Sequence, residues 1–154
     1  MLDSTAGKFE ITEFQVEDLA AVFELEQLCF KDPYPWWLLS ELSRKNPDTF
    51  IVASLDSKIV GYAVVDKWDE DRQFHLVSIA VHPNERRRGV ATMMLRNLET
   101  RLSPGLTLRL EVRKSNDAAT NFYSKHNFIR TGTISGYYSD GEDAIVMEKR
   151  TVGA

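Results

Sequence analysis

Residues 78–91 read Ser78-Ile79-Ala80-Val81-His82-Pro83-Asn84-Glu85-Arg86-Arg87-Arg88-Gly89-Val90-Ala91. This stretch predicts an apolar strand that enters a basic, glycine-containing turn and continues as a helix. Such a turn points free backbone N–H groups at whatever lies beyond the helix start, and the helix dipole favours an anion there. A glycine lets the backbone approach a bulky phosphate, and arginine side chains add charge-assisted hydrogen bonds. The stretch therefore predicts a phosphate-binding turn in an α/β protein.

This turn differs from two widespread phosphate-binding loops. It lacks the Gly-x-Gly-x-x-Gly pattern of dinucleotide-binding folds and the Gly-Lys-Ser/Thr ending of nucleoside triphosphate loops. A pyrophosphate ligand of another type is therefore expected. On the basic triplet alone, the alternative remains that three arginines decorate a solvated turn, because runs of charge are usually solvated.

Hydrophobic periodicity on both sides of this stretch predicts helices and strands over the rest of the chain. Strands are expected at residues 9–14, 49–55, 59–65, 74–81, 106–112, 128–134 and 144–149. Helices are expected at residues 17–30, 36–44, 89–102 and 117–126, and Asn116 is a natural N-cap for the last of them. These elements predict one mixed α/β domain over residues 1–154, with a sheet of about six or seven strands and about four helices.

The bulk composition fits an ordinary globular domain. The chain has 154 residues, of which 43% are hydrophobic and 27% charged, and its net charge of -4 argues against a nucleic-acid partner. One cysteine cannot form an internal disulfide, and residues 1–9 do not resemble a signal peptide. No stretch approaches the roughly 20 apolar residues that span a membrane. With three scattered histidines that lack metal-ligand spacing, these features predict a cytoplasmic protein without a metal ion.

A second set of motifs follows the phosphate-binding turn. It comprises Leu110-Glu111-Val112-Arg113, Ser115-Asn116, Ala119, Tyr123, Asn127-Phe128 and the loop from Gly136 to Ala144. With the spacing Arg86-x-x-Gly89-x-Ala91, these motifs resemble the GNAT superfamily of acetyl-CoA-dependent N-acetyltransferases over about residues 9–150. Within it they are similar to RimI-like enzymes, which acetylate protein N-termini, and to archaeal Ard-type N-terminal acetyltransferases. Asn127 replaces the usual glycine, but asparagine tolerates the left-handed conformation better than most residues.

The resemblance implies a GNAT fold in which the fourth and fifth strands splay apart and acetyl-CoA binds as the cosubstrate. Free amides of the fourth strand would then bind the pantetheine arm, and the turn would grip the pyrophosphate. Backbone N–H groups near Ala80 and Val81 would stabilise the oxyanion that forms during transfer. The implied acetyl-CoA-binding residues are Ile79, Ala80, Val81, Arg86, Arg87, Arg88, Gly89, Val90, Ala91, Asn116 and Tyr123.

The same resemblance implies three catalytic side chains, Glu111, His75 and Tyr123. Glu111 is the first candidate base, because its strand neighbours should face the opposite side and leave its carboxylate toward the splay, where burial can raise its pKa. His75 can share the proton relay, since the unperturbed pKa of a histidine suits proton transfer near neutrality. Tyr123 can protonate or hold the departing thiolate. From the residues alone, three alternatives stay open: a surface carboxylate paired with an arginine, a strand histidine without a role, and a core aromatic.

The acceptor side is expected at two aromatic loops. The residues implied to contact the peptide are Phe30, Asp32, Pro33 and Tyr34 between the first two helices, and Tyr137 and Tyr138 in the late loop. The first loop would contact the first side chain of the peptide, with Asp32 helping to set the preference. The late tyrosines would hold the peptide backbone through their hydroxyls. The alternative is a hydrophobic staple that pins two short helices.

The implied function is acetylation of the N-terminal α-amino group of proteins, with ribosomal proteins or nascent chains as candidate acceptors. An α-amine has a pKa of about 7.7–8.0 and a lysine about 10.4, so roughly 10–20% of the first and far below 1% of the second is neutral at neutral pH. A modest base therefore suffices for direct attack by an N-terminus in a ternary complex. Two alternatives stay open: acetylation of lysine or a small amine, and a non-catalytic acyl-CoA-binding regulatory module.

Overall fold

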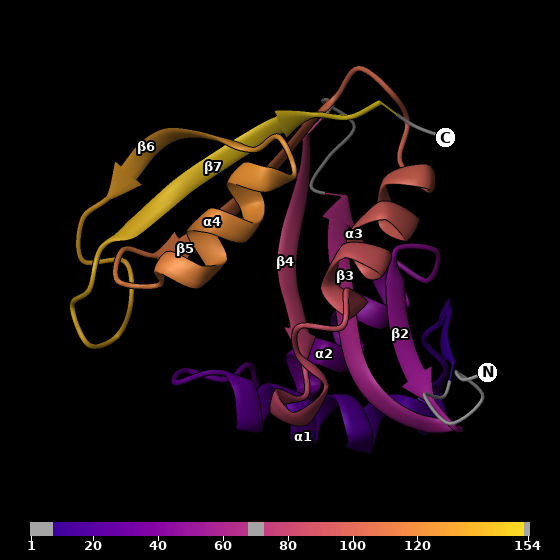
Figure 1. The fold of residues 1–154 in the computed structure, drawn as a ribbon. Coiled ribbons are helices and arrows are strands. Elements are labelled where there is room, and N and C mark those ends of the chain that lie inside the picture. Colours follow the sequence, from indigo (N-terminus) through magenta and orange to yellow (C-terminus); the bar gives the residue numbers. More distant parts are fainter. Residues whose placement is uncertain (1–7, 68–72, 153–154) are drawn as a thin grey trace.

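The strands of the protein form one mixed sheet in the computed structural model, which describes residues 8–67 and 73–152 (Figure 1). The strands of the described residues are β1 (Phe9–Glu13), β2 (Phe50–Leu55), β3 (Lys58–Lys67), β4 (Gln73–Val81), β5 (Thr107–Arg113), β6 (Ile129–Ile134) and β7 (Ala144–Arg150). Their order across the sheet is β1-β2-β3-β4-β5-β7-β6. All neighbours run antiparallel except β4 and β5, which run parallel. The predicted mixed sheet is therefore confirmed.

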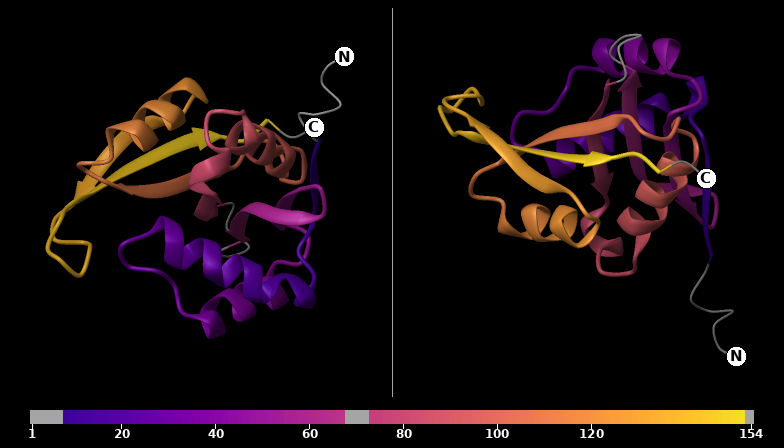
Figure 2. Two further views of the ribbon diagram at one scale, coloured as in Figure 1. Left: turned by 60° about the horizontal axis from the view of Figure 1, so that its bottom comes forward. Right: turned by 90° about the horizontal axis from the view of Figure 1, so that it is seen from above.

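The helices cover both faces of this sheet. They are α1 (Leu19–Cys29), α2 (Trp36–Lys45), α3 (Val90–Thr100) and α4 (Asp117–Lys125). Figure 2 shows α1 and α2 on one face, and α3 and α4 on the other. Each pair contributes to its own apolar core against the sheet. Because both faces are covered, the central strand β3 is buried almost continuously from Val60 to Asp66 instead of alternating.

The first helix begins later than the periodicity of residues 17–30 predicts. Residues Val16–Asp18 form a 3-10 turn, and the α-helix starts at Leu19. The backbone N–H of Gln15 donates to Oδ2 of Asp18 at 2.8 Å, which closes this turn before the helix. The apolar pattern alone could not reveal this local competition between side chain and backbone.

The parallel strands β4 and β5 pair over only part of their length. Register pairs run from Gln73 with Thr107 to His75 with Arg109. β4 continues to Val81 with β3 as its partner on the other side, so beyond His75 its backbone groups that face β5 have no strand partner. The predicted splay between the fourth and fifth strands is confirmed, and Figure 1 shows the two strands diverging.

A β-bulge lies in the splayed half of β4. Leu76 pairs with Val65 and Ser78 with Val64, so Val77 has no opposite residue on β3. A bulge of this kind bends a strand and re-aims its backbone groups. The carbonyl of Val77 is thereby available to a side chain from another element.

Candidate active site

The two residues predicted as base and proton relay meet where β4 and β5 part. His75 is the last β4 residue in register with β5, where it pairs with Arg109. Glu111 follows Arg109 by two residues on β5. Nε2 of His75 is 2.6 Å from Oε1 of Glu111, and Nε of Arg109 donates to Oε2 at 3.0 Å. The side chains of His75 and Glu111 are only 13% and 8% exposed. The splay thus holds a shielded histidine–carboxylate pair.

The pKa of Glu111 departs from the sequence-based expectation. Burial raises this pKa, but the contacts with His75 and Arg109 lower it by more, so the net pKa lies below the usual value. The expected upward shift is therefore wrong, because nitrogen donors offset the cost of desolvating the carboxylate. An arginine partner is present, as one alternative supposed, yet only 8% of the Glu111 side chain is exposed. Glu111 is ionised at neutral pH, and Nε2 of His75 is then the donor in their contact.

The basic turn has the backbone shape that its glycine predicts. Gly89 directly precedes α3 with a φ of 81°, and a Cβ built there would meet no described atom within 4 Å. Arg87 is also left-handed, with a φ of 68°. No side chain caps the first turn of α3. The N–H groups at this helix start are therefore open to an anion.

Arg86 turns back toward the strand that precedes it. Its Nε donates to the carbonyl of Val81 at 3.0 Å, and its Nη2 lies 3.5 Å from Sγ of Cys29. Cys29 is half-buried, and burial raises the pKa of its thiol. This arginine thus fastens the end of β4 to the end of α1.

The other two arginines of the turn are exposed. Nη1 of Arg88 lies 3.0 Å from Oε1 of Glu85. That distance marks an ion pair without hydrogen-bond geometry, because the buried Oε1 has no hydrogen-bond partner among the described residues. Arg87 makes no ion pair or hydrogen bond within residues 8–67 and 73–152. Arg87 is therefore the guanidinium most available to a phosphate.

Helix α4 carries two further predicted residues, Asn116 at its N-cap and Tyr123. Oδ1 of Asn116 accepts the N–H of Ala119 at 3.1 Å, which confirms the predicted cap. Tyr123 is 9% exposed, and its ring packs edge-on against Phe128 with centroids 5.4 Å apart. Burial and then the nearby Tyr138 raise the pKa of the Tyr123 hydroxyl, which is therefore protonated at neutral pH. The ring belongs to the core, and its hydroxyl has no partner in the described part of the chain.

Two loops that are distant in sequence meet beside the His75–Glu111 pair. They are the α1–α2 loop (residues 30–35) and the β6–β7 loop (residues 135–143). Oδ2 of Asp32 accepts from Oγ of Ser139 at 2.6 Å and from Nη2 of Arg113 at 3.2 Å. Nζ of Lys31 pairs with Oδ2 of Asp140 at 3.3 Å. The two loops expected on the acceptor side are thus in direct contact.

Arg113 joins both loops to β5. Its Nη1 contacts Asp140 at 3.0 Å and Glu142 at 2.8 Å, and its guanidinium carbon lies 4.1 Å from the ring centroid of Tyr138. Side chains two residues apart on a strand share a face. Arg113 therefore lies on the same face of β5 as Glu111, so the loops are fastened beside the carboxylate.

The tyrosines expected to hold a peptide gather around the same carboxylate. The hydroxyl of Tyr34 lies 3.5 Å from the carbonyl of Val77. Burial raises the pKa of Tyr34, and nearby groups that include Tyr137 and Glu111 raise it further. The rings of Tyr137 and Tyr138 pack edge-on with centroids 4.9 Å apart. Aromatic surface and phenol hydroxyls therefore line this side of the site.

The remaining predicted residues of the α1–α2 loop are accessible. Phe30 is 37% exposed, Asp32 is exposed and Pro33 is half-buried. The loop therefore presents apolar surface beside the carboxylate of Asp32.

Sequence reasoning missed Glu26 of α1. This residue is 1% exposed. Its Oε2 accepts the N–H of Tyr34 at 2.9 Å, and its Oε1 accepts from the hydroxyls of Tyr62 and of Ser78, the latter at 3.4 Å. Burial raises the pKa of its carboxyl group. A signal was available, because Glu26 follows Val22 by four positions on the apolar side of the helix, where a carboxylate must find buried partners.

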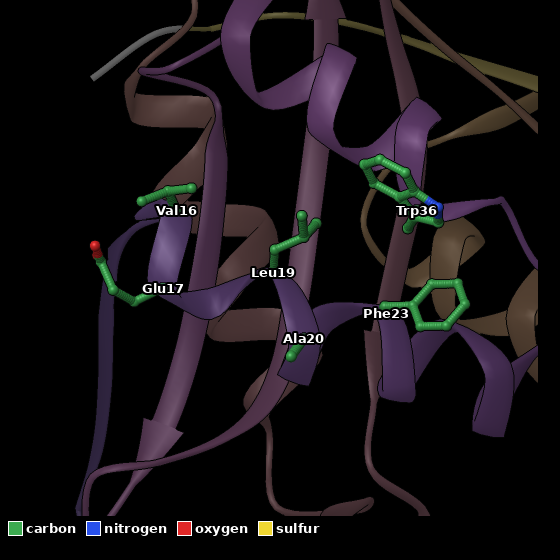
Figure 3. Close-up of a pocket in the computed structure, with 6 residues that line it drawn as sticks. All are labelled: Val16, Glu17, Leu19, Ala20, Phe23 and Trp36. Atoms are coloured by element: carbon green, nitrogen blue, oxygen red, sulfur yellow. The ribbon is translucent and has the colours of Figure 1, made fainter.

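An apolar pocket of about 430 Å³ lies elsewhere, against α1 and the first residue of α2. It is lined by Val16, Glu17, Leu19, Ala20, Phe23 and Trp36 (Figure 3). None of these residues belongs to the site between β4 and β5. Within the described residues, no three histidine, cysteine, aspartate or glutamate side chains gather as metal ligands. No helix in that part of the chain is long and apolar enough to cross a membrane.

Comparison with known proteins identifies the family. Residues 17–128 match the model of the Acetyltransferase (GNAT) family. This chain belongs to the GNAT acetyltransferases. The matched residues contain the basic turn, His75, Glu111 and the α1–α2 loop, and the β6–β7 loop lies beyond them. The chain is therefore an acetyl-CoA-dependent N-acetyltransferase.

Individual relatives point the same way. An uncharacterized N-acetyltransferase of Methanocaldococcus jannaschii is 36% identical and covers 94% of this chain and 93% of its own length. An N-alpha-acetyltransferase of Saccharolobus solfataricus is 30% identical over 92% of each chain. The crystal structure of Ard1 from Thermoplasma volcanium has a TM-score of 0.88 at 29% identity, covering 94% of this chain and 98% of its own. The resemblance of the sequence motifs to Ard-type enzymes is confirmed.

Proposed function

We propose that this GNAT enzyme transfers the acetyl group of acetyl-CoA to the N-terminal α-amino group of proteins by direct attack of the amine. The observation that carries the proposal is the His75–Glu111 pair at the point where β4 and β5 separate. The splayed strand on one side offers a donor site, and the joined aromatic loops on the other side offer an acceptor site. The proton relay adjoins both.

The donor site is proposed along β4 and the start of α3. When bound, acetyl-CoA supplies the activated acetyl group. Unpaired N–H groups of β4 would hold the pantetheine arm and polarise the thioester carbonyl, and the open start of α3 would hold the pyrophosphate. The residues proposed for these contacts are Ile79, Ala80, Val81, Arg86, Arg87, Arg88, Gly89, Val90, Ala91, Asn116 and Tyr123. Because Arg86 already donates to the carbonyl of Val81, Arg87 and Arg88 are proposed to make most of the charged contacts with the pyrophosphate.

Side-chain hydrogen bonds on β4 support this placement. The hydroxyl of Tyr34 approaches the carbonyl of Val77 at 3.5 Å, and Arg86 donates to the carbonyl of Val81 at 3.0 Å. Between them, no side chain of the described residues bonds the backbone of residues 78–80. This central segment is the one that the proposal assigns to the donor.

The acceptor amine must lose a proton during the attack. A carboxylate with a lowered pKa is a weak proton acceptor but a strong partner for a charged imidazole ring. We therefore propose that His75 takes the proton and that Glu111 orients and stabilises the charged ring. Tyr123 is protonated at neutral pH and would donate to the departing sulfur.

The acceptor site is proposed between the two loops. Its proposed residues are Phe30, Asp32, Pro33, Tyr34, Tyr137 and Tyr138. The contacts of Asp32 with Ser139 and of Lys31 with Asp140 join the loops directly. Where two loops are joined and close one side of a site, the end of a peptide chain can enter more readily than the middle of an extended chain. This supports an α-amine as the acceptor, and ribosomal proteins and nascent chains are candidate substrates for one domain acting in the cytoplasm.

Release of free thiol from acetyl-CoA tests this function. Three matched peptides would be offered: one with a free N-terminus and no lysine, one with a blocked N-terminus and an internal lysine, and one with neither. Turnover with the first peptide alone is expected. Turnover with the lysine peptide would move the acceptor to lysine or a small amine, and acetyl-CoA binding without turnover would indicate a non-catalytic module.

A further inference from the structure

Glu26 is the least exposed charged side chain among the described residues. Its hydrogen-bond donors come from three places: Tyr62 of β3, Ser78 of β4 and the backbone N–H of Tyr34 in the α1–α2 loop. No basic side chain in the described part of the chain pairs with it. A buried carboxylate without a cation is costly unless hydrogen bonds satisfy it. All three donors are neutral, so the charge is held by hydrogen bonds alone.

Stability does not explain a carboxylate at this place. The apolar residues Val22, Leu25 and Leu39 belong to the core on this face of the sheet. An apolar side chain of similar volume commonly replaces a buried charged group at no cost in stability. What the carboxylate adds, and an apolar side chain would not, is a set of hydrogen bonds that join α1 to β3, to β4 and to the α1–α2 loop.

Tyr34 is held at both ends, by Glu26 at its backbone and by Val77 at its hydroxyl. The backbone N–H of Tyr34 is held by Oε2 of Glu26 at 2.9 Å, and its hydroxyl lies 3.5 Å from the carbonyl of Val77 in the bulge of β4. The other carboxylate oxygen of Glu26 contacts Ser78, the next residue of β4. One carboxylate thus joins the acceptor loop to the splayed strand that offers the donor site.

We propose that Glu26 is a positioning residue for acetyl transfer, which holds Tyr34 and the α1–α2 loop against the splayed half of β4. The inference rests on the proposed function, because it assigns the loop to the acceptor and the strand to the donor. Glu26 touches neither reacting group and acts through Tyr34. It sets how closely a peptide amine bound at the loop approaches the acetyl group.

Steady-state kinetics of Glu26→Leu and Glu26→Gln test the role. Leucine keeps the volume but removes both acceptor oxygens, so the peptide KM is expected to rise at least about tenfold while the Kd of acetyl-CoA changes less than about threefold. Glutamine keeps one carbonyl oxygen for the N–H of Tyr34, so it is expected to restore most of the peptide kcat/KM. Glu99→Leu is the control, because Glu99 is another buried carboxylate and pairs with Lys149 outside the site.

The rate of hydrogen exchange at the Tyr34 amide measures, without any substrate, whether Glu26 holds this N–H. Exchange is expected to accelerate at least about tenfold in Glu26→Leu and to stay near the wild-type rate in Glu26→Gln and Glu99→Leu. Unchanged exchange in Glu26→Leu, or an equal rise of peptide KM in Glu99→Leu, overturns the proposal. If the wild type acetylates no peptide N-terminus, the proposed function fails, and the exchange rate alone then decides whether Glu26 anchors the loop.

Discussion

At the scale of single residues, the surroundings of Glu111 decide its chemistry. His75 and Arg109 hold the carboxylate ionised at neutral pH. Glu111→Gln keeps the shape of the side chain but removes the charge that stabilises a protonated His75. We expect kcat/KM for the peptide to fall by about 10²–10⁴-fold, the usual contribution of acid–base catalysis. Thiol release measures this effect, with the Kd of acetyl-CoA as the control, and full activity in the folded variant would contradict the assignment.

Two buried carboxylates are expected to respond to pH in opposite directions. The pKa of Glu111 is lowered by folding, so its contribution to stability is present above the unfolded value of about 4.3 and is lost as the pH falls through the folded pKa. The pKa of Glu26 is raised, so this residue costs stability above about 4.3, and that cost disappears on acidification.

Denaturant unfolding between about pH 7 and pH 3 checks these signs. The free energy of unfolding of the wild type minus that of Glu111→Gln should decrease as the pH falls. The corresponding difference for Glu26→Gln should increase over the same range. Two differences that moved in the same direction would show that the environments assigned to these groups are incorrect.

At the scale of elements, substitutions in the basic turn should change the affinity for acetyl-CoA alone. Arg87 is exposed and unpaired within the described residues, whereas Arg86 bonds the carbonyl of Val81. We expect Arg87→Ala to raise the Kd of acetyl-CoA by roughly tenfold, because a hydrogen bond to a charged group contributes about 1.5–3 kcal/mol. Isothermal titration at two salt concentrations measures this effect, and Lys58→Ala in the β2–β3 hairpin serves as a surface control. An unchanged Kd would remove Arg87 from the donor site.

Substitutions that loosen the two acceptor loops should change the peptide KM alone. Arg113 contacts Asp32, Asp140 and Glu142, and these partly exposed ion pairs should contribute about 0–1 kcal/mol each. Arg113→Gln is therefore expected to raise the peptide KM by about threefold to tenfold, with less effect at high salt, where the wild-type ion pairs are screened. A matching rise in the Kd of acetyl-CoA would contradict a role confined to the acceptor loops.

At the scale of the whole molecule, the sequence predicted features that depend on local pattern. Alternation and periodicity gave the sheet and the helices, and Asn127 adopts the left-handed conformation expected of it, with a φ of 73°. Features that depend on three-dimensional neighbours were missed or misjudged. The pKa of Glu111 depends on Arg109 as well as His75, and the partners of Glu26 come from β3 and β4. No pattern along the chain encodes such contacts directly.

We propose that the splayed strand holds the donor and that the two joined loops hold the acceptor, the α-amine of a chain end. The most direct measurement offers acetyl-CoA and one peptide that carries both a free N-terminus and an internal lysine, and locates the added acetyl group by tandem mass spectrometry. Acetylation of the α-amine is expected, with the lysine unmodified. Acetylation of the lysine, with the α-amine left free, would contradict it.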